Sequence, residues 1–591
     1  MINEPLFQSN ILATIYRNFH FYFFEGIYFY DEKQSLIFWI LGVSIFLYAN
    51  YFLVKYKQKT TYPNLFPSEK YSFDKNDKLH FFALFLLILV LIIYSFVICS
   101  LEQSLFVNYD LMNIGTTLAF KNGLAADVNH LRFLPLGFFD LNLLYAVSHN
   151  LIIFNVYTIL KQLLIVCLMY KAFDFIPVTK RLLGMALIFI SPSFFWLNNI
   201  VFPEQNLIVF VLLSFMALKN FSKTNNYIYL WCFVLCVNFA IYIKETTILL
   251  YFGILICSFL YNLARDNFGF NDLIHPFKTI RKFPLEYMIL VSIVVFYTLF
   301  YLMTDQGTNI YTEVHKRSLL FVLNIYKYEL VVCIFALLFF IKNIIKKDFH
   351  ESPIIIGGTL LGGMLISFII VFYYSLISFP VHKTYYLLLP TLFSLMYLVK
   401  EIKNVRSFAL LYILLFSSSL AINYNFFIKE EGKDNAALAE LISQKIENDK
   451  EISLYFIVKN PLEIWYIECM SSGLKYYFPN ANITIYTKYV PRINEIKEKF
   501  FEINKQMKKD NEQLFEYLMQ NEHKFNPISK INVDMVEKLI RLGVYHQYKQ
   551  KDNYEIGDYV IYQYDVPDNL PGKEVLNNKK YKVYYVDDKN I

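Results

Sequence analysis

Six ionisable residues that could do chemistry stand in short polar joins between long apolar stretches of this chain. They are Asp110, Arg132, Glu204, Lys244, Glu245 and His382. Charges at the mouths of such joins are costly unless they face water or each other. Any one of them could merely mark the end of a helix, but as a set they suggest one cavity. Its carboxylates could act as a general base, and its cations could hold an anionic group.

The first of these residues belongs to a join of unusual length, residues 102–150, and loops of this length are usually functional. Within it, apolar residues from Leu111 to Phe120 are spaced as in an amphipathic helix, and a second apolar piece runs from Leu131 to Leu144. We expect two short helices along a membrane surface, with Asp110 at the entry of the first. A carboxylate at a helix N-terminus is stabilised as an anion, which suits a general base and equally suits an ordinary cap.

The elements that must position these residues are apolar stretches of near-bilayer length. About 17–25 apolar residues in a helix match the hydrocarbon thickness. We expect about twelve transmembrane helices, and therefore a polytopic α-helical membrane protein. The candidate spans are Leu36–Val54, Phe81–Leu101, Leu151–Tyr170, Leu182–Ile200, Asn206–Leu218, Tyr227–Ile243, Thr246–Leu263, Leu285–Met303, Leu330–Ile345, Ile354–Ile377, Tyr385–Val399 and Phe408–Tyr424.

The joins alternate in charge. Lys and Arg residues follow every odd-numbered span, as at Lys171, Lys219 and Lys400. Because positive loops stay cytoplasmic, the joins that carry the candidate site residues are expected on the outer side. An even number of spans would also place the chain after residue 428 on that side. Lys161 is the clearest charge in the middle of a span.

Composition supports a membrane domain joined to a soluble part: 56% of the 591 residues are hydrophobic, and the mean hydropathy is +0.38. The net charge of +6 is modest and spread over the joins. We therefore attribute the basic residues to the orientation of the spans in the membrane, and we expect no nucleic-acid partner. Six of the seven cysteines lie in apolar spans, which indicates no disulfide framework. His130 could bind a metal, but it has no partner at a ligand spacing, so no metal site is predicted and metal use is left open.

The polar tail, residues 429–591, is expected to form a small external α/β domain. A helix is predicted over Asn435–Asn448, strands over Ile452–Val458 and Lys580–Val586, and a hairpin with a Gly-Asp turn within Tyr554–Tyr562. One or two charged helices are predicted over Ile493–Met519. The tail shows no catalytic constellation.

Several short runs, in this order along the chain, resemble segments of the GT-C glycosyltransferases that use polyprenyl-phosphate-linked sugars. These include the protein O-mannosyltransferase, aminoarabinose transferase and RgtA-like families. The runs are Phe106–Asp110, His130–Leu136, the Phe202–Glu204 turn, the Lys244–Thr246 turn and Tyr385–Pro390. The resemblance covers about the first two-thirds of the chain, residues 1–428, which would be the transmembrane catalytic domain.

The resemblance implies an inverting glycosyltransferase. Asp110 would take the proton of the acceptor hydroxyl, Arg132, Lys244 and Lys383 would hold the lipid phosphate, and Glu204 would position the sugar or orient Lys244. The candidate donor-binding residues are Arg132, His130, Glu204, Lys244, Glu245, His382 and Lys383. The donor would be a polyprenyl-phosphate-linked sugar, and the acceptor a glycan, lipid or protein of the cell envelope.

Two other functions remain open on the sequence: a transporter or flippase for lipid-linked glycans, and a non-catalytic assembly protein. Transporters usually carry internal repeats and ionisable groups at mid-membrane depth, whereas the charges here gather at one face. The expected location is the inner (plasma) membrane, multi-pass, with residues 429–591 periplasmic or extracellular.

Overall fold

The structure is a computed structural model of the whole chain. It describes residues 32–56, 136–148 without 138, 151–195, 203–266, 282–303, 319–346, 354–376, 387–413 without 406, 432–448, 451–457, 482–487, 549–563, 572–578 and 581–587, together with Phe66, Phe82, Leu86 and Leu89.

Most apolar stretches of the first 428 residues form helices that end at the polar joins. They are α2 (Glu32–Tyr56), α5 (Phe139–Val147), α6 (Leu151–Ala172), α7 (Val178–Ile190), α8 (Pro192–Phe195), α9 (Glu204–Thr224), α10 (Tyr227–Ile243), α11 (Thr247–Asp266), α14 (Pro284–Met303), α15 (Leu319–Lys346), α16 (Ile354–Leu376) and α17 (Leu388–Glu401). The bounds of α10 are those predicted for its span. The predicted spans Phe81–Leu101 and Phe408–Tyr424 lie mostly outside the described residues.

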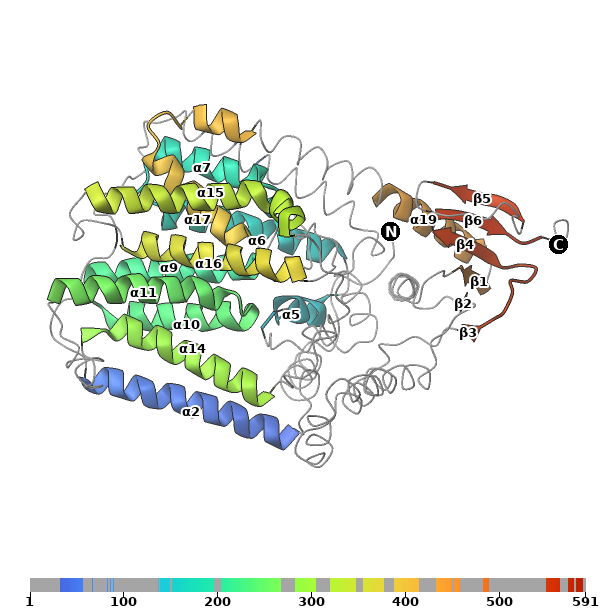
Figure 1. Cartoon of the computed structure of the whole chain (residues 1–591). Coiled ribbons are helices and arrows are strands. Elements are labelled where there is room, and N and C mark those ends of the chain that lie inside the picture. Colours follow the sequence, from blue (N-terminus) through green and yellow to red (C-terminus); the bar gives the residue numbers. More distant parts are fainter. Residues whose placement is uncertain are drawn as a thin grey trace, which may run out of the picture.

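The helices pack side by side as a bundle around one apolar core (Figure 1). Helix α14 lies against α2 and α11, α11 packs along α16, and α16 lies against α15 and α17. The α11–α16 contact is the closest, because a Cβ atom on Gly358 would lie 2.6 Å from Cα of Ile254 and one on Gly362 would lie 2.5 Å from Cα of Leu250. The small glycine residues of α16 therefore let the two helix backbones approach closely.

The expectation of about twelve transmembrane helices, and with it the polytopic fold class, is wrong for this structure. Among the described residues, only Glu204–Thr224 and Ile354–Val371 form helices long and apolar enough to cross a membrane. The other apolar helical segments that qualify by composition are shorter, such as the 17 residues of Tyr227–Ile243. A break in the helix can divide an apolar run of the sequence into shorter segments.

The predicted span Leu182–Ile200 shows how such a break arises. Helix α7 ends at Ile190 after 13 residues, and Ser191 has extended dihedral angles. The residue before a proline is disfavoured in the helical region, and Pro192 follows directly. Proline is well tolerated at the first position of a helix, so the four-residue α8 begins there.

The tail forms a separate α/β unit with its own cores. Helix α19 (Gly432–Asn448) precedes the strands β1 (Glu451–Phe456), β2 (Asn482–Thr487), β3 (Lys549–Gln550), β4 (Tyr559–Gln563), β5 (Lys573–Asn577) and β6 (Tyr581–Tyr585). The described strands form one sheet in the order β3-β2-β1-β4-β6-β5. The first four are parallel and the last two antiparallel to their neighbours.

The predicted helix and the strands β1 and β6 of the tail are confirmed, but the predicted hairpin is wrong. Gly557 has a positive φ of 94° and makes the turn that leads into β4. That strand then pairs with β1 and β6, which come from other parts of the chain. The hairpin of this domain is β5–β6 instead. The charged helices predicted over Ile493–Met519 lie outside the described residues.

Opposite faces of the sheet bury different side chains. Leu438 and Ile442 of α19 pack against one face, where Leu454 is buried. The other face gathers aromatic residues, with Tyr455 and Tyr584 in its core. At the start of β4, the carboxylate of Asp558 accepts hydrogen bonds from Ser453 Oγ, from Lys551 Nζ (2.8 Å) and from the backbone N–H of Glu555 (2.7 Å). This network fixes the loop to the sheet.

Candidate functional site at the open end of the α9–α10 hairpin

Two predicted site residues, Glu204 and Lys244, form a buried ion pair between Lys244 Nζ and Glu204 Oε1. Each side chain is only 5% exposed. Glu204 is the first residue of α9 and Lys244 directly follows α10, so the two are 40 residues apart in sequence although they meet in space. A buried charge needs a partner to offset its loss of hydration, and here each residue is that partner for the other.

The local sequence explains why these two side chains meet. Helices α9 and α10 pack along each other, and the tight turn between them is made by Asn225, which has a left-handed φ of 54°, and by Asn226, whose side chain caps α10. At the other end of the hairpin, Pro203 directly precedes α9 and Lys244 directly follows α10. A carboxylate in the first turn of a helix and a cation at a helix C-terminus are both favoured by the helix dipole.

After Lys244 the chain turns sharply into α11. The N–H groups of Thr247 and Ile248 donate to the carbonyls of Lys244 and Glu245, each at 3.1 Å, and Thr247 Oγ1 also donates to Lys244 O at 2.8 Å. These bonds fix the backbone of Lys244 on both sides. Glu245 is half-buried next to the pair.

A second buried ion pair lies beside the first. Asp140 Oδ2 accepts hydrogen bonds from Lys161 Nζ and Tyr157 OH, both at 2.9 Å. The Lys161 ammonium also stands 4.6 Å from the centre of the Tyr157 ring. Asp140 belongs to the first turn of α5, and Lys161 to the middle of α6. The lone charge in this predicted span therefore has a partner.

The two ion pairs meet at the N-terminus of α9. Burial alone would raise the pKa of Asp140, but the charge of Lys161 and hydrogen bonds from Asn206, Lys161 and Tyr157 outweigh it, so the pKa falls below its ordinary value of 3.8. Asn206 stands two residues after Glu204 in the same helical turn. The backbone N–H of Leu136 donates to Tyr242 O at 3.2 Å, which ties the segment before α5 to the end of α10.

The site that these contacts define consists of Glu204, Lys244, Asp140, Lys161 and Asn206. One oxygen of the first carboxylate, Glu204 Oε2, is buried and has no hydrogen-bond partner among the described residues. A buried carboxylate oxygen of this kind is an acceptor for a hydroxyl group. Four helices, α5, α6, α9 and α10, hold the site, so its charged groups are fixed before any ligand arrives.

The structure brings together only part of the predicted site. Glu204 and Lys244 meet, and Glu245 is adjacent in the chain. The other predicted site residues, Asp110, His130, Arg132, His382 and Lys383, lie outside the described residues, as does most of the predicted pair of surface helices. Helix α5 overlaps the end of the second predicted surface helix, Leu131–Leu144.

The Asp140–Lys161 pair was not predicted as part of the site. The signal was present, because Lys161 is a charge in an apolar span and such a charge needs a partner. Spacing along the chain does not show that Asp140 faces Lys161, 21 residues later. Glu329 is another charged residue within an apolar helix, α15. It is buried, and Ser193 Oγ donates to it at 3.4 Å.

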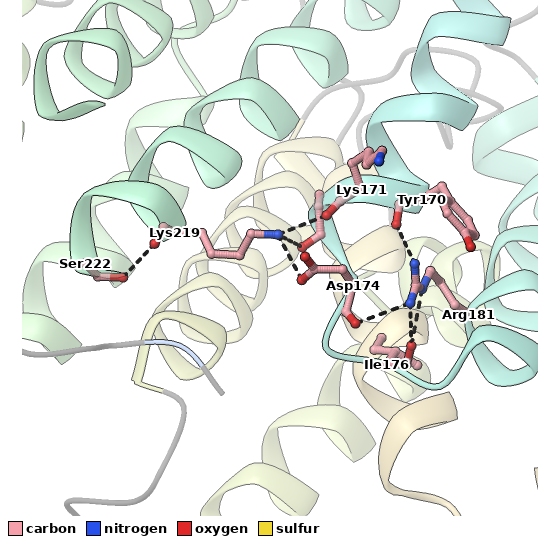
Figure 2. Close-up of polar contacts among 8 residues, drawn as sticks. Tyr170, Lys171, Asp174, Ile176, Arg181, Lys219 and Ser222 are labelled. Carbon is pink, nitrogen blue, oxygen red and sulfur yellow. Dashed lines mark hydrogen bonds and ion pairs between the residues drawn. The ribbon is translucent and has the colours of Figure 1, made fainter. Parts of the chain in front are cut away.

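A third polar cluster, near the other end of α9, has a structural role (Figure 2). Arg181 is almost fully buried and donates to the carbonyls of Tyr170 (2.9 Å), Asp174 (3.2 Å) and Ile176 (2.9 Å). Lys219 Nζ donates to Lys171 O and to Asp174 Oδ1, both at 2.9 Å. These cations occupy the carbonyl groups left open at the C-terminal end of α6 and in the turn after it.

Within the part of the chain that the structure describes, no group of three or more His, Cys, Asp or Glu residues comes together as a metal site. Comparison with models of protein families and with curated proteins gives no match to this chain.

Proposed function

We propose that this protein is a membrane glycosyltransferase that moves a sugar from a polyprenyl-phosphate donor to an acceptor of the cell envelope, with inversion at the anomeric carbon. The observation that carries the proposal is the buried Glu204–Lys244 ion pair beside Asp140–Lys161. Two carboxylates and two ammonium groups, fixed by four helices, provide hydrogen-bond acceptors for a sugar and positive charge for a phosphate.

Each member of the first pair has a distinct role in this proposal. Lys244 provides positive charge at the departing lipid phosphate, and the hydrogen bond that it donates to Glu204 Oε1 holds its ammonium in place. Glu204 Oε2 accepts a hydrogen bond from a sugar hydroxyl. Charge that is positioned before the reaction stabilises a developing anion without reorganisation, and in a site with little water this effect is large.

The transfer itself needs a base at the acceptor. In the proposed step, the acceptor oxygen attacks the anomeric carbon, the bond from that carbon to the phosphate oxygen breaks, and Asp110 takes the acceptor proton. The phosphate leaves as a polyprenyl phosphate anion. Proton abstraction by a positioned base typically contributes about 10²–10⁴-fold to a rate. Arg132 and Lys383 are proposed as further phosphate ligands, and His130, Glu245 and His382 as further donor contacts.

The surface of the helical domain supports a location in a lipid bilayer. Helix α2 exposes a series of large apolar side chains, with Ile37, Leu47 and Tyr48 each more than half exposed, and α15 exposes Phe335 and Leu338 in the same way. Monomeric soluble proteins rarely expose large continuous apolar patches. Contact with lipid on these faces would remove the free-energy cost of exposing apolar side chains to water.

The proposal is tested by mass spectrometry of the surface glycans of a host that lacks the protein and is complemented with variants. Asp110→Asn and Lys244→Met should fail to restore the sugar that wild type adds, while Lys346→Met, at an exposed lysine of α15, should restore it. Normal glycans with Asp110→Asn at wild-type protein level would exclude Asp110 as the base. Accumulation of a completed lipid-linked glycan without the protein would favour a transporter instead.

A further inference from the structure

An apolar groove of about 690 Å³ runs along the bundle between α2, α10 and α14. Residues that line it are also exposed at the surface of the protein: Val43 is 54%, Trp231 47% and Leu235 59% exposed. The groove therefore opens sideways, away from the core, onto the apolar surface of α2 and α10. It is a site distinct from the ion pairs at the N-terminal end of α9.

The chemistry of the lining selects an apolar ligand. Among the residues that the structure describes, none of those lining the groove is charged. Its two asparagines are engaged within the protein: Asn50 Nδ2 donates to Phe46 O at 2.8 Å, and Asn238 Nδ2 donates to Val234 O (2.8 Å) and Ser292 Oγ (3.0 Å). A hydrocarbon chain fits such a lining, whereas a polar ligand would lose its hydration without new hydrogen bonds.

Basic residues gather at one end of the groove. Helices α2 and α14 run antiparallel, since Gly42 packs on Leu299 while Tyr287 OH lies 3.5 Å from Ala49 O. The end of the groove at Asn50 therefore lies near the start of α14. Three lysines come to this end from separate elements: Lys55 in the last turn of α2, Lys223 in the last turn of α9, and Lys282 just before α14. Their charge complements a phosphate.

From this arrangement we infer that the groove binds one acyl chain of an anionic glycerophospholipid, whose phosphate lies at Lys55, Lys223 and Lys282. The chain extends from Asn50 along α10 toward Trp39. The inference shares with the proposed function only the location in a bilayer, because the groove contains none of the residues assigned to sugar transfer. It adds a lipid site to the protein whatever reaction the protein performs.

The inference is tested by photolabelling of the full-length protein, purified in a mild detergent. The probes are phosphatidylglycerol and phosphatidylcholine with the same diazirine-bearing acyl chain. Wild type should be labelled on α2 or α10 and more strongly by phosphatidylglycerol. Leu235→Trp should lower the yield about tenfold by filling the groove, while Leu338→Trp, at a 55% exposed position of α15, should leave it unchanged. Lys55→Gln should lower only the phosphatidylglycerol yield, about fivefold, and Lys346→Gln should not.

Several results would overturn the inference. Equal labelling by both lipids, equal loss in Leu338→Trp, or labels spread over all helices would show nonspecific lipid contact. A detergent-stable dimer that Leu235→Trp dissociates would show that a second copy fills the groove. Displacement of the probe by equimolar polyprenyl phosphate would assign the groove to that lipid. Lys244→Met separates the two proposals, because it should abolish sugar transfer and leave the labelling intact.

Discussion

At the scale of the residue, the candidate site is a pair of charges that depend on each other. Glu204 and Lys244 are both buried, so each charge depends on the other to offset its loss of hydration. The helix termini favour their signs, since the carboxylate begins α9 and the ammonium ends α10. Removal of the second partner should therefore cost less stability once the first is gone.

The first prediction is a double-mutant cycle on this pair. Glu204→Gln and Lys244→Met should each lower the free energy of unfolding by about 3 kcal/mol, because each leaves a buried charge without its partner. The double variant should lose clearly less than the sum. Unfolding in detergent, followed by circular dichroism, measures this coupling. Simple additivity would mean that the two charges do not interact in the folded protein.

The second prediction concerns the pH dependence of stability from Asp140. Its pKa is lowered in the folded protein, through Lys161 and three hydrogen bonds that outweigh burial. A depressed carboxyl pKa stabilises the folded state above the ordinary value of 3.8, and this stabilisation is lost as the pH falls through the folded-state pKa. The stability difference between wild type and Asp140→Asn should therefore be constant near neutral pH and shrink below pH 3.8. A difference that grows in acid would contradict the ion pair.

Sequence alone indicated some of these residues and not others. Glu204 and Lys244 were predicted because a charge at the mouth of an apolar hairpin is rare and costly. Asp140 was missed as a partner of Lys161 because the pairing depends on how α5 folds back onto α6. That contact is between elements, and no local pattern encodes it. The proposed base, Asp110, remains a prediction from the sequence.

At the scale of the element, apolar pattern located the helices but overstated their number as spans. The predicted Tyr227–Ile243 agrees with α10, since polar residues stand at both of its ends. In contrast, Pro192 divides the predicted Leu182–Ile200, and α17 has only 14 residues. In the tail, the Gly557–Asp558 turn was predicted, but the partners of β4 were not. Strand partners are chosen by the whole sheet, and turn chemistry alone does not reveal them.

The third prediction concerns the close contact of α11 with α16. Gly358→Ala places a Cβ atom 2.6 Å from the backbone of Ile254, so the helices must separate. We expect a loss of about 1–3 kcal/mol in the free energy of unfolding. Gly184→Ala is the matched control, because its added Cβ would meet side chains only, those of Met396 and Val399. Equal thermal stability of both variants would contradict backbone contact between the two helices.

For the whole molecule, the proposed reaction depends on the side of the membrane on which the ends of the helices lie. Two described helices, α9 and the start of α16, can cross a bilayer by length and composition. The site lies at the N-terminal end of α9, and the cluster around Arg181 and Lys219 lies near its other end. Basic residues such as Lys171, Lys180 and Lys223 gather at that other end, which favours it as the cytoplasmic side.

Cysteine labelling of intact cells tests this arrangement most directly. In a background without native cysteines, a membrane-impermeant maleimide should label both Asp110→Cys and Thr246→Cys from outside. Thr224→Cys, at the exposed opposite end of α9, should react only after the cells are opened. This result places the proposed base and the Glu204–Lys244 pair in one compartment. Labelling of Asp110→Cys and Thr246→Cys from opposite sides would contradict the account, because no single reaction could then use both groups.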